Sequence, residues 1–197
     1  VWYFRAIPVH GRKEQAMRWR GVHHVELSVL DYEKSIEFYD RMFGWLGYTS
    51  FWTLDIGYHS TYYMARFPVP HSYIGIQPAK SGSKLDHEAR ATGIHHIAIW
   101  GKNRREIDAF HSEFLIPNDI HVTEPPTEYP IYAPGYYAVF FDDPVNGIHW
   151  ELAYTPRIPS ISAYRKFTRA IREEEKKHPE WGGSAVKQAM RKLPGRD

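Results

Sequence analysis

The chain contains no cysteine among its 197 residues. Disulfides, thiolate nucleophiles, iron–sulfur clusters and thiolate-bound zinc are therefore excluded, and any metal must be held by imidazole, carboxylate, amide or water. The sequence also lacks an apolar run approaching the ~18 residues of a membrane-spanning helix, and its first residues lack a signal-peptide core. We therefore expect a soluble, cytoplasmic protein with no membrane partner.

Charge of one sign is not in excess either. The chain has 25 Lys and Arg against 23 Asp and Glu, a formal net charge of +2, so charge alone does not predict nucleic acid as a partner. Phosphate-binding loops, nucleophile elbows and zinc-binding helix motifs are missing as well. What the sequence does have is 12 histidines and 16% aromatic residues, which suit a metal site beside a pocket for a small-molecule substrate.

An internal repeat organises the chain. The segment Gly-Val-His-His-Val-Glu-Leu at 21–27 aligns without gaps with Gly-Ile-His-His-Ile-Ala-Ile at 93–99. Further along, Tyr62-Tyr63 aligns with Tyr136-Tyr137, and Gln77 aligns with Glu151. Such self-similarity predicts two copies of one supersecondary unit.

Each copy has the pattern of a strand, a helix and further strands. The first copy predicts strands at 22–29, 48–54, 60–66 and 72–77 and a helix at 32–43 capped by Asp31. The second predicts strands at 94–100, 136–141 and 147–154 and a helix at 104–114 capped by Asn103. We expect an α+β fold of two βαβββ modules, at 21–90 and 91–156.

Two segments lie outside the repeat. Residues 1–20 form a polar and basic N-terminal arm, and residues 157–197 form a C-terminal extension with helical periodicity at 163–177 and 184–192. The extension has the pattern of an amphipathic helix that packs on the modules or on a partner subunit, and a lid over the site is the alternative.

The alternation of side chains along a strand selects candidate metal ligands. The apolar face of each first strand must meet the helix, so His24 and His96 point to the opposite face, and His23 and His95 pack beneath the helices. On the last strand of the second copy the same reasoning turns Glu151 away from the helices. Nitrogen and oxygen donors of this kind suit one divalent ion: Fe²⁺, Mn²⁺, Co²⁺, Ni²⁺ or Zn²⁺.

These motifs resemble the vicinal oxygen chelate superfamily, which includes glyoxalases, epimerases, resistance proteins and extradiol dioxygenases. The resemblance rests on the paired His-His strand openings and on the closing segment Phe-Asp-Asp-Pro-Val-Asn-Gly-Ile-His-Trp-Glu at 141–151. It implies a curved, half-open barrel around a divalent metal that chelates a substrate, and a homodimer by analogy. The family's epimerase-like ligand set of His, Gln, His and Glu would add Gln77 as a fourth ligand.

The leading hypothesis is metal-assisted, non-redox proton transfer of the isomerase, epimerase or lyase type. Glu26 and His149, each two residues from a predicted ligand on the same strand face, are the candidate bases. An Fe(II) dioxygenase of extradiol type, with a triad of two His and one Glu, is the first alternative, and a ligand-sequestering resistance protein is the second. Tyr129, Tyr132 and Tyr136 would line the pocket mouth in each case.

Overall fold

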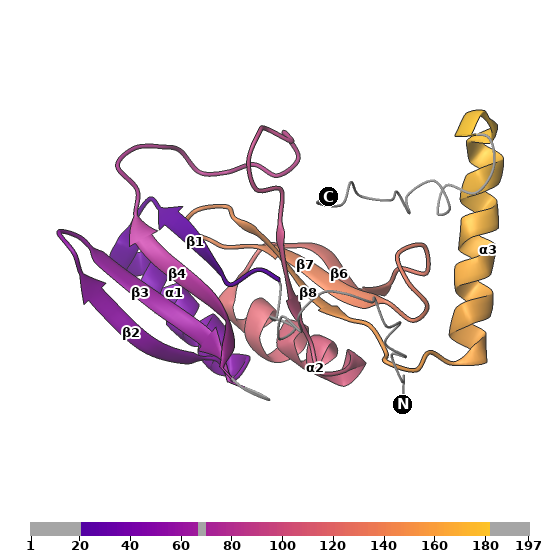
Figure 1. Cartoon of the computed structure of the whole chain (residues 1–197), viewed down its shortest axis with the longest axis horizontal. Coiled ribbons are helices and arrows are strands. Elements are labelled where there is room, and N and C mark those ends of the chain that lie inside the picture. The colour runs from indigo at the N-terminus through magenta and orange to yellow at the C-terminus, as the bar shows by residue number, and fades with distance from the viewer. Residues whose placement is uncertain (1–20, 67–69, 182–197) are drawn as a thin grey trace, which may run out of the picture.

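The computed structural model describes residues 21–66 and 70–181. The predicted N-terminal arm and the predicted helix at 184–192 lie outside these residues. In the described part of the chain, two four-stranded mixed sheets with their helices follow one another along the sequence (Figure 1).

The first module contains one helix and four strands. Its elements are β1 (His24–Val29), α1 (Tyr32–Trp45), β2 (Thr49–Asp55), β3 (His59–Ala65) and β4 (His71–Pro78). The strand order is β1-β4-β3-β2, with β1 parallel to β4 and the other pairs antiparallel. As predicted, Asp31 caps α1, because its side chain accepts a hydrogen bond of 3.1 Å from the Lys34 amide.

The second module repeats this topology, with strand order β5-β8-β7-β6. Its elements are β5 (Ile97–Trp100), α2 (Arg104–Ala109), the π-helix η1 (Phe110–Leu115), the 3-10 turn η2 (Ile116–Asn118), β6 (Val122–Glu128), β7 (Tyr137–Asp142) and β8 (His149–Tyr154). The predicted α+β fold of two βαβββ modules is confirmed. Strand β6 was not predicted, because Pro125 and Pro126 interrupt its pattern; both are tolerated on this edge strand, where the register shifts.

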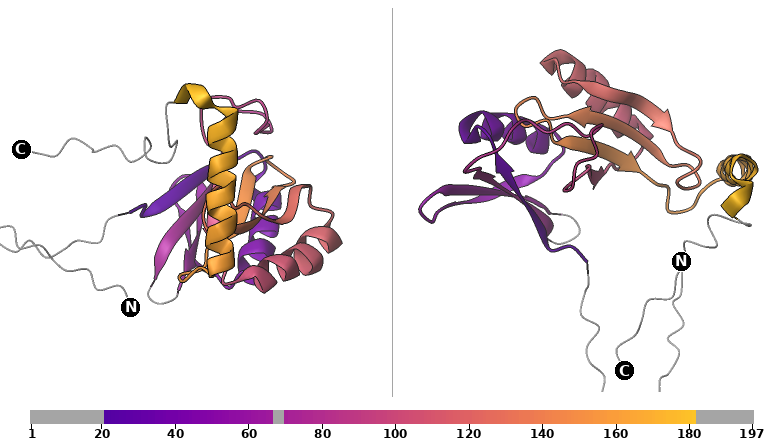
Figure 2. Two further views of the ribbon diagram at one scale, coloured as in Figure 1. Left: turned by 90° about the vertical axis from the view of Figure 1, so that its right-hand side faces the viewer. Right: turned by 90° about the horizontal axis from the view of Figure 1, so that it is seen from above.

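One hydrophobic core joins the two modules. Helix α1 packs on its own sheet through Phe43 and Tyr63, whose ring centroids are 4.7 Å apart, and on the second module through Tyr39 and Trp150, at 5.9 Å. Both helices therefore lie on one side, and the opposite faces of the two sheets turn toward the same open side (Figure 2, right). The sheets do not close into a barrel.

The C-terminal extension begins with α3 (Ile161–Lys177), which Ser160 caps, and continues to the 3-10 turn η3 (Pro179–Trp181). Figure 1 shows α3 at the far end of the second module, beside the loop that joins β6 to β7. Lys166 on α3 binds Glu128 at the end of β6, with an Nζ–Oε2 distance of 2.5 Å. Within the described ranges, every helix is too short or too polar to cross a membrane.

Candidate metal centre

A cavity of about 640 Å³ lies on the open side of the second sheet. Its wall carries six ionisable or aromatic side chains from the segment between β5 and the end of β8, and five from the connection between the modules. The lining residues are His87, Glu88, Arg90, His95, His96, Glu124, Tyr132, Tyr136, Phe140, His149 and Glu151. All of them follow β4 in the chain, so none of the described residues in the helix and strands of the first module lines this wall.

Glu151 and His96 meet at this wall. Glu151 is buried, with a relative exposure of 3%, and its Oε2 lies 3.4 Å from Nε2 of His96. Its other oxygen accepts a 2.6 Å hydrogen bond from the Tyr136 hydroxyl. Burial and the neighbouring carboxylate raise the pKa of Tyr136, so this hydroxyl stays protonated and acts as the donor.

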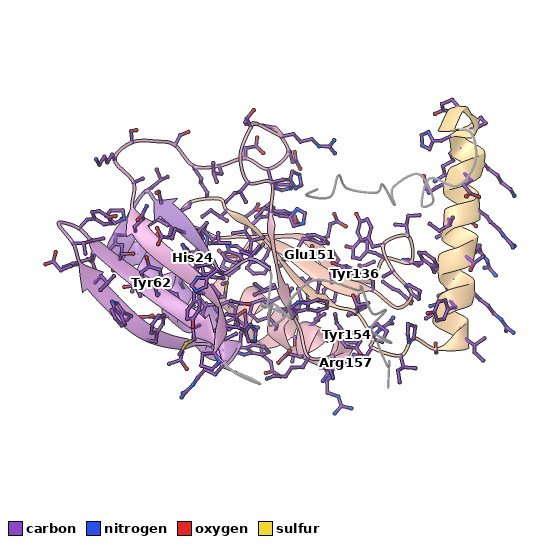
Figure 3. The ribbon with its side chains drawn as sticks, viewed as in Figure 1. His24, Tyr62, Tyr136, Glu151, Tyr154 and Arg157 are labelled. Carbon is purple, nitrogen blue, oxygen red and sulfur yellow. The ribbon has the colours of Figure 1, made fainter. Side chains whose placement is uncertain are left out.

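The structure does not bring His24 to this pair. His24 lies at the start of β1 on the first module, exposed, with its Nδ1 2.9 Å from Nδ1 of His23. In Figure 3, His24 and Tyr62 lie on the first sheet, whereas Tyr136 and Glu151 lie on the second. Of the three residues predicted as principal ligands, His96 and Glu151 therefore meet within one chain and His24 does not.

Strand pairing corrects the repeat alignment at Gln77. Ala98 on β5 is the Cα partner of Glu151, and Glu26, which occupies the same place in β1 as Ala98 does in β5, is the partner of Gly75. Gly75, and not Gln77, thus holds the position equivalent to Glu151. The sequence alignment used an offset of 74 residues between the copies at this strand, whereas strand pairing gives 76, so the alignment was wrong by two residues. Gln77 sits near the end of β4, and its amide donates a 3.2 Å hydrogen bond to Ser28.

Gly75 leaves space for a side-chain contact on the open face of the first sheet. A Cβ added there would lie 2.8 Å from Cε1 of Tyr62 and 3.1 Å from Cγ of Glu26. The absence of a side chain therefore lets the Tyr62 hydroxyl donate a hydrogen bond to the Glu26 carboxylate across the strand between them. Glu26, a predicted base, lies on this face with His24 and outside the cavity.

The tyrosines before β7 form an aromatic cluster at the cavity. Tyr132 and Tyr136 line it, with ring centroids 5.5 Å apart. Tyr129 stacks on Tyr132 at 5.6 Å, and its hydroxyl donates a 2.7 Å hydrogen bond to Glu124, another lining residue. Tyr132 and Tyr136 meet edge to face, with planes inclined by 84°, so the tyrosines provide an aromatic corner next to the polar wall.

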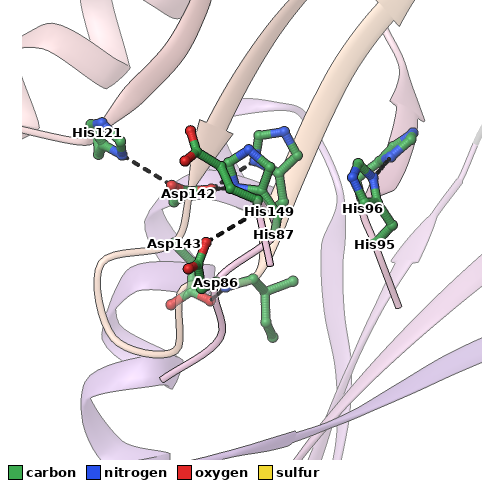
Figure 4. Close-up of polar contacts among 10 residues, drawn as sticks. Asp86, His87, His95, His96, His121, Asp142, Asp143 and His149 are labelled. Carbon is green, nitrogen blue, oxygen red and sulfur yellow. Dashed lines mark hydrogen bonds and ion pairs between the residues drawn. The ribbon is translucent and has the colours of Figure 1, made fainter. Parts of the chain in front are cut away.

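His149, the second predicted base, belongs to a cluster around Asp142 (Figure 4). Its Nδ1 lies 2.6 Å from Asp142 Oδ1, and Nδ1 of His87 lies 3.4 Å from the same oxygen. Nδ1 of His121 lies 3.0 Å from Oδ2. Burial lowers the pKa of His149, while the hydrogen bond to Asp142 acts in the opposite direction.

Sequence reasoning missed Asp142, His87 and His121. Asp142 could have been found, because a hairpin around the Asp-Pro turn makes it the cross-strand partner of His149. His87 lies in the connection between the modules and His121 just before β6, and neither has a periodic pattern that would place it.

His23 and His95 do not pack beneath the helices as predicted. His23 is exposed and stacks on Tyr73, with ring centroids 5.2 Å apart, and His95 is exposed at the cavity. The expectation was wrong because both residues precede the first strand residue that faces the core. The helix-facing row begins only at Val25 and Ile97, which pack against the core.

The donors at the cavity fit a divalent ion. His96 and Glu151 supply one imidazole nitrogen and carboxylate oxygens, the ligands that first-row divalent metals prefer. Neither Lys nor Arg pairs with the buried Glu151 carboxylate in the described part of the chain, where its polar partners are Tyr136 and His96. A buried carboxylate of this kind gains most from a bound cation.

Comparisons with known proteins agree with the fold. The family model described as "Glyoxalase/Bleomycin resistance protein/Dioxygenase superfamily" matches residues 21–152. A solved structure from Bacillus halodurans, named as a glyoxalase, is 25% identical and covers 72% of this chain and 97% of its own, with a TM-score of 0.53. No curated protein matches the sequence.

Two more distant structures share the fold. A glyoxylase/bleomycin resistance protein/dioxygenase domain from Frankia sp. EAN1pec is 17% identical, with a TM-score of 0.55, and covers 71% of this chain and 100% of its own. The fosfomycin resistance protein FosX from Listeria monocytogenes is 16% identical, with a TM-score of 0.51, and covers 71% and 97%.

Proposed function

Because the chain belongs to the glyoxalase/bleomycin resistance protein/dioxygenase superfamily, we propose that it is a divalent-metal enzyme acting on a small oxygenated substrate. The reaction is non-redox proton transfer, of the isomerase, epimerase or lyase type. The observation that carries the proposal is the convergence of His96 and the buried Glu151 at the wall of a cavity of about 640 Å³. That volume suits a small molecule.

His24 of a second copy of the chain completes the ligand set in this proposal. Within one chain, His24 lies on the open face of the first sheet and outside the cavity. Both open faces carry exposed aromatic side chains, Phe51 at 39% exposure on the first sheet and Trp100 at 77% on the second. Apolar surface of this kind favours association, so we propose a homodimer in which the two open faces meet.

A bound divalent ion would act as a Lewis acid on a substrate carbonyl and favour the enolate. The chain's own residues orient the ligands and move the proton. Tyr136 fixes the Glu151 carboxylate through its 2.6 Å hydrogen bond. Glu26 shares a strand face with His24 and would enter the site with it, held by Tyr62, as the proton-transfer base.

One observation favours an Fe(II) dioxygenase as a second candidate. Gly75 occupies the position equivalent to Glu151, so the first module offers no side chain there. If Gln77 does not bind, two His and one Glu leave coordination positions open for O₂. Phe140 counts against this candidate: ring-cleaving relatives carry a tyrosine at this position, and here the ring stacks on His149.

Three measurements on the purified protein test the proposal. We expect a bound divalent metal, exchange of solvent deuterium into carbonyl compounds with acidic α-protons, and no oxygen uptake with catechols. His96→Ala and Glu151→Gln should each abolish exchange and the binding of the ion held by His96 and Glu151, whereas His59→Ala, at an exposed histidine on β3, should change neither. Fe(II)-dependent oxygen uptake would instead identify the protein as a dioxygenase. A metal content per chain that neither ligand variant lowers would refute the site. Binding of ligands without turnover would identify a sequestering protein.

A further inference from the structure

We propose that His87, Asp142 and His149 form a second divalent-cation site. This site is separate from the His96–Glu151 pair. It does not depend on the proposed reaction, because it rests on a different set of side chains.

The donor atoms already converge. One nitrogen of His87, one of His149 and one oxygen of Asp142 all lie within 4.8 Å of one another. Zinc-to-nitrogen bonds of about 2.0 to 2.1 Å place the donors of a tetrahedral site roughly 3.3 Å apart. The 2.6 and 3.4 Å distances from Asp142 Oδ1 to the two rings bracket this value. Seating an ion among them requires the stacked rings to turn apart, because each metal–nitrogen bond lies in the plane of its imidazole ring.

A bound ion accounts for this arrangement better than hydrogen bonds alone. The rings of His87 and His149 stack with centroids 3.6 Å apart and planes inclined by 8°, and both direct Nδ1 at the same carboxylate oxygen. Two positive charges on rings this close would repel each other. The Asp142 side chain is only 17% exposed, and in the described ranges its ion-pair partners are all histidines. A divalent ion supplies the missing positive charge and uses the ring nitrogens as donors.

The backbone holds these donors in place before any ion binds. Asp142 and His149 are cross-strand partners on β7 and β8. The connection that carries His87 packs on the turn between these strands, where the Leu85 amide donates a 2.7 Å hydrogen bond to the Asn146 carbonyl. Gly147 permits this approach, because a Cβ at that position would lie 2.3 Å from the Leu85 carbonyl oxygen. The backbone positions of the ligands are therefore set before binding, and the imidazole rings of His87 and His149 reorient when an ion enters.

The donor set defines the class of ion. Two imidazoles and one carboxylate suit zinc, cobalt or nickel rather than magnesium or calcium. The ligands come from the connection between the modules and from the second sheet, so a bound ion would tie the two together. His87 and His149 also line the cavity, which gives the ion a route of entry.

The test is the number of cations bound per chain. The protein is stripped with a chelator, dialysed against Zn²⁺ and analysed for metal, and Co²⁺ binding is followed in parallel by its visible spectrum. We expect two independent cation sites in the wild type, of which His87→Asn with Asp142→Asn removes one and His96→Ala with Glu151→Gln removes the other. His59→Asn, on the first module, is the matched control and should leave binding unchanged. His87→Asn alone, in a connection outside the sheets, serves if the double variant is unstable.

Each outcome decides between the two sites. A cation that survives His96→Ala with Glu151→Gln and is lost in the His87 and Asp142 variant supports the inference, even if the proposed enzyme site fails. A single cation that survives in the His87 and Asp142 variant, or no bound cation at all, overturns it. A single cation that survives in that variant would leave the proposed function intact, because it would be the ion held by His96 and Glu151.

Discussion

The Tyr136 hydroxyl holds one oxygen of the buried Glu151 carboxylate and leaves the other facing His96. Removing this hydroxyl frees the carboxylate to rotate, and hydrogen bonds that orient metal ligands typically contribute 10- to 100-fold in affinity. We expect Tyr136→Phe to weaken Zn²⁺ binding at the Glu151 site by roughly 10-fold or more, measured by competition with a chromogenic chelator.

Tyr137→Phe is the matched control for this prediction. Its hydroxyl binds Asp108 on α2, away from the cavity, at 2.7 Å. Equal losses of affinity in the two variants would mean that general loosening of β7, and not the orientation of Glu151, causes the effect.

The turn between β7 and β8 depends on Gly147, whose φ of +68° favours glycine and whose Cα faces the Leu85 carbonyl. Gly147→Ala adds a methyl group where the connection between the modules packs. We expect a loss of about 1–3 kcal/mol in the free energy of unfolding, measured by urea denaturation.

Gly57→Ala provides the comparison. Gly57 has a φ of +90°, but a Cβ there would contact nothing within 4 Å. Its substitution should therefore cost only the backbone strain, about 1 kcal/mol. If the two variants lose the same free energy, the close approach of Leu85 does not contribute to stability.

One carboxylate links helix α3 to the second module. Glu128 pairs with Lys166 on α3 and with Arg104 on α2, and these partners hold the pKa of Glu128 below its ordinary value of 4.5. A carboxyl group whose pKa is lowered in the folded state stabilises the fold at pH values above its ordinary pKa. This contribution is lost as the pH falls from the ordinary pKa through the lower, folded-state pKa. We expect amide exchange in α3 to accelerate, relative to the rest of the chain, below about pH 4.5.

Glu128→Gln should show the faster α3 exchange already at pH 7, with little further change on acidification. This outcome separates Glu128 from the other carboxylates that titrate in the same range. An unchanged exchange rate in the variant at pH 7 would show that other contacts hold the helix.

Across the whole molecule, the separation of His24 from Glu151 implies that a complete site needs two chains. His24→Ala and Glu151→Gln homodimers should both lack the intact ligand set. When the two variants are unfolded and refolded together, random pairing restores it in about one quarter of the sites. We expect metal binding at the Glu151 site and activity to return to this level.

A mixture that remains as inactive as its parents would show that His24 and Glu151 act within one chain or not at all. Light scattering of the wild type provides an independent measurement, since a monomer would contradict the shared site. Trp100→Ser, which removes an exposed aromatic ring from the open face of the second sheet, should weaken the dimer.

The sequence by itself determined the family and the architecture of the modules. The His-His strand openings and the Asp-Pro turn are local patterns, and alternation along a strand was sufficient to direct His24, His96 and Glu151 away from the helices. The caps Asp31 and Asn103 were predicted for the same reason, because capping depends on neighbouring residues.

Only the tertiary structure decided which of these side chains meet. Strand register places Gly75 opposite Glu26, whereas a two-residue error in alignment leaves every side chain on the same face and cannot be detected from alternation. The cluster of His87, His121 and Asp142 depends on contacts between segments far apart in the chain. The separation of His24 from Glu151 follows from how α1 packs between the sheets, which is a property of the shared core and not of any single segment.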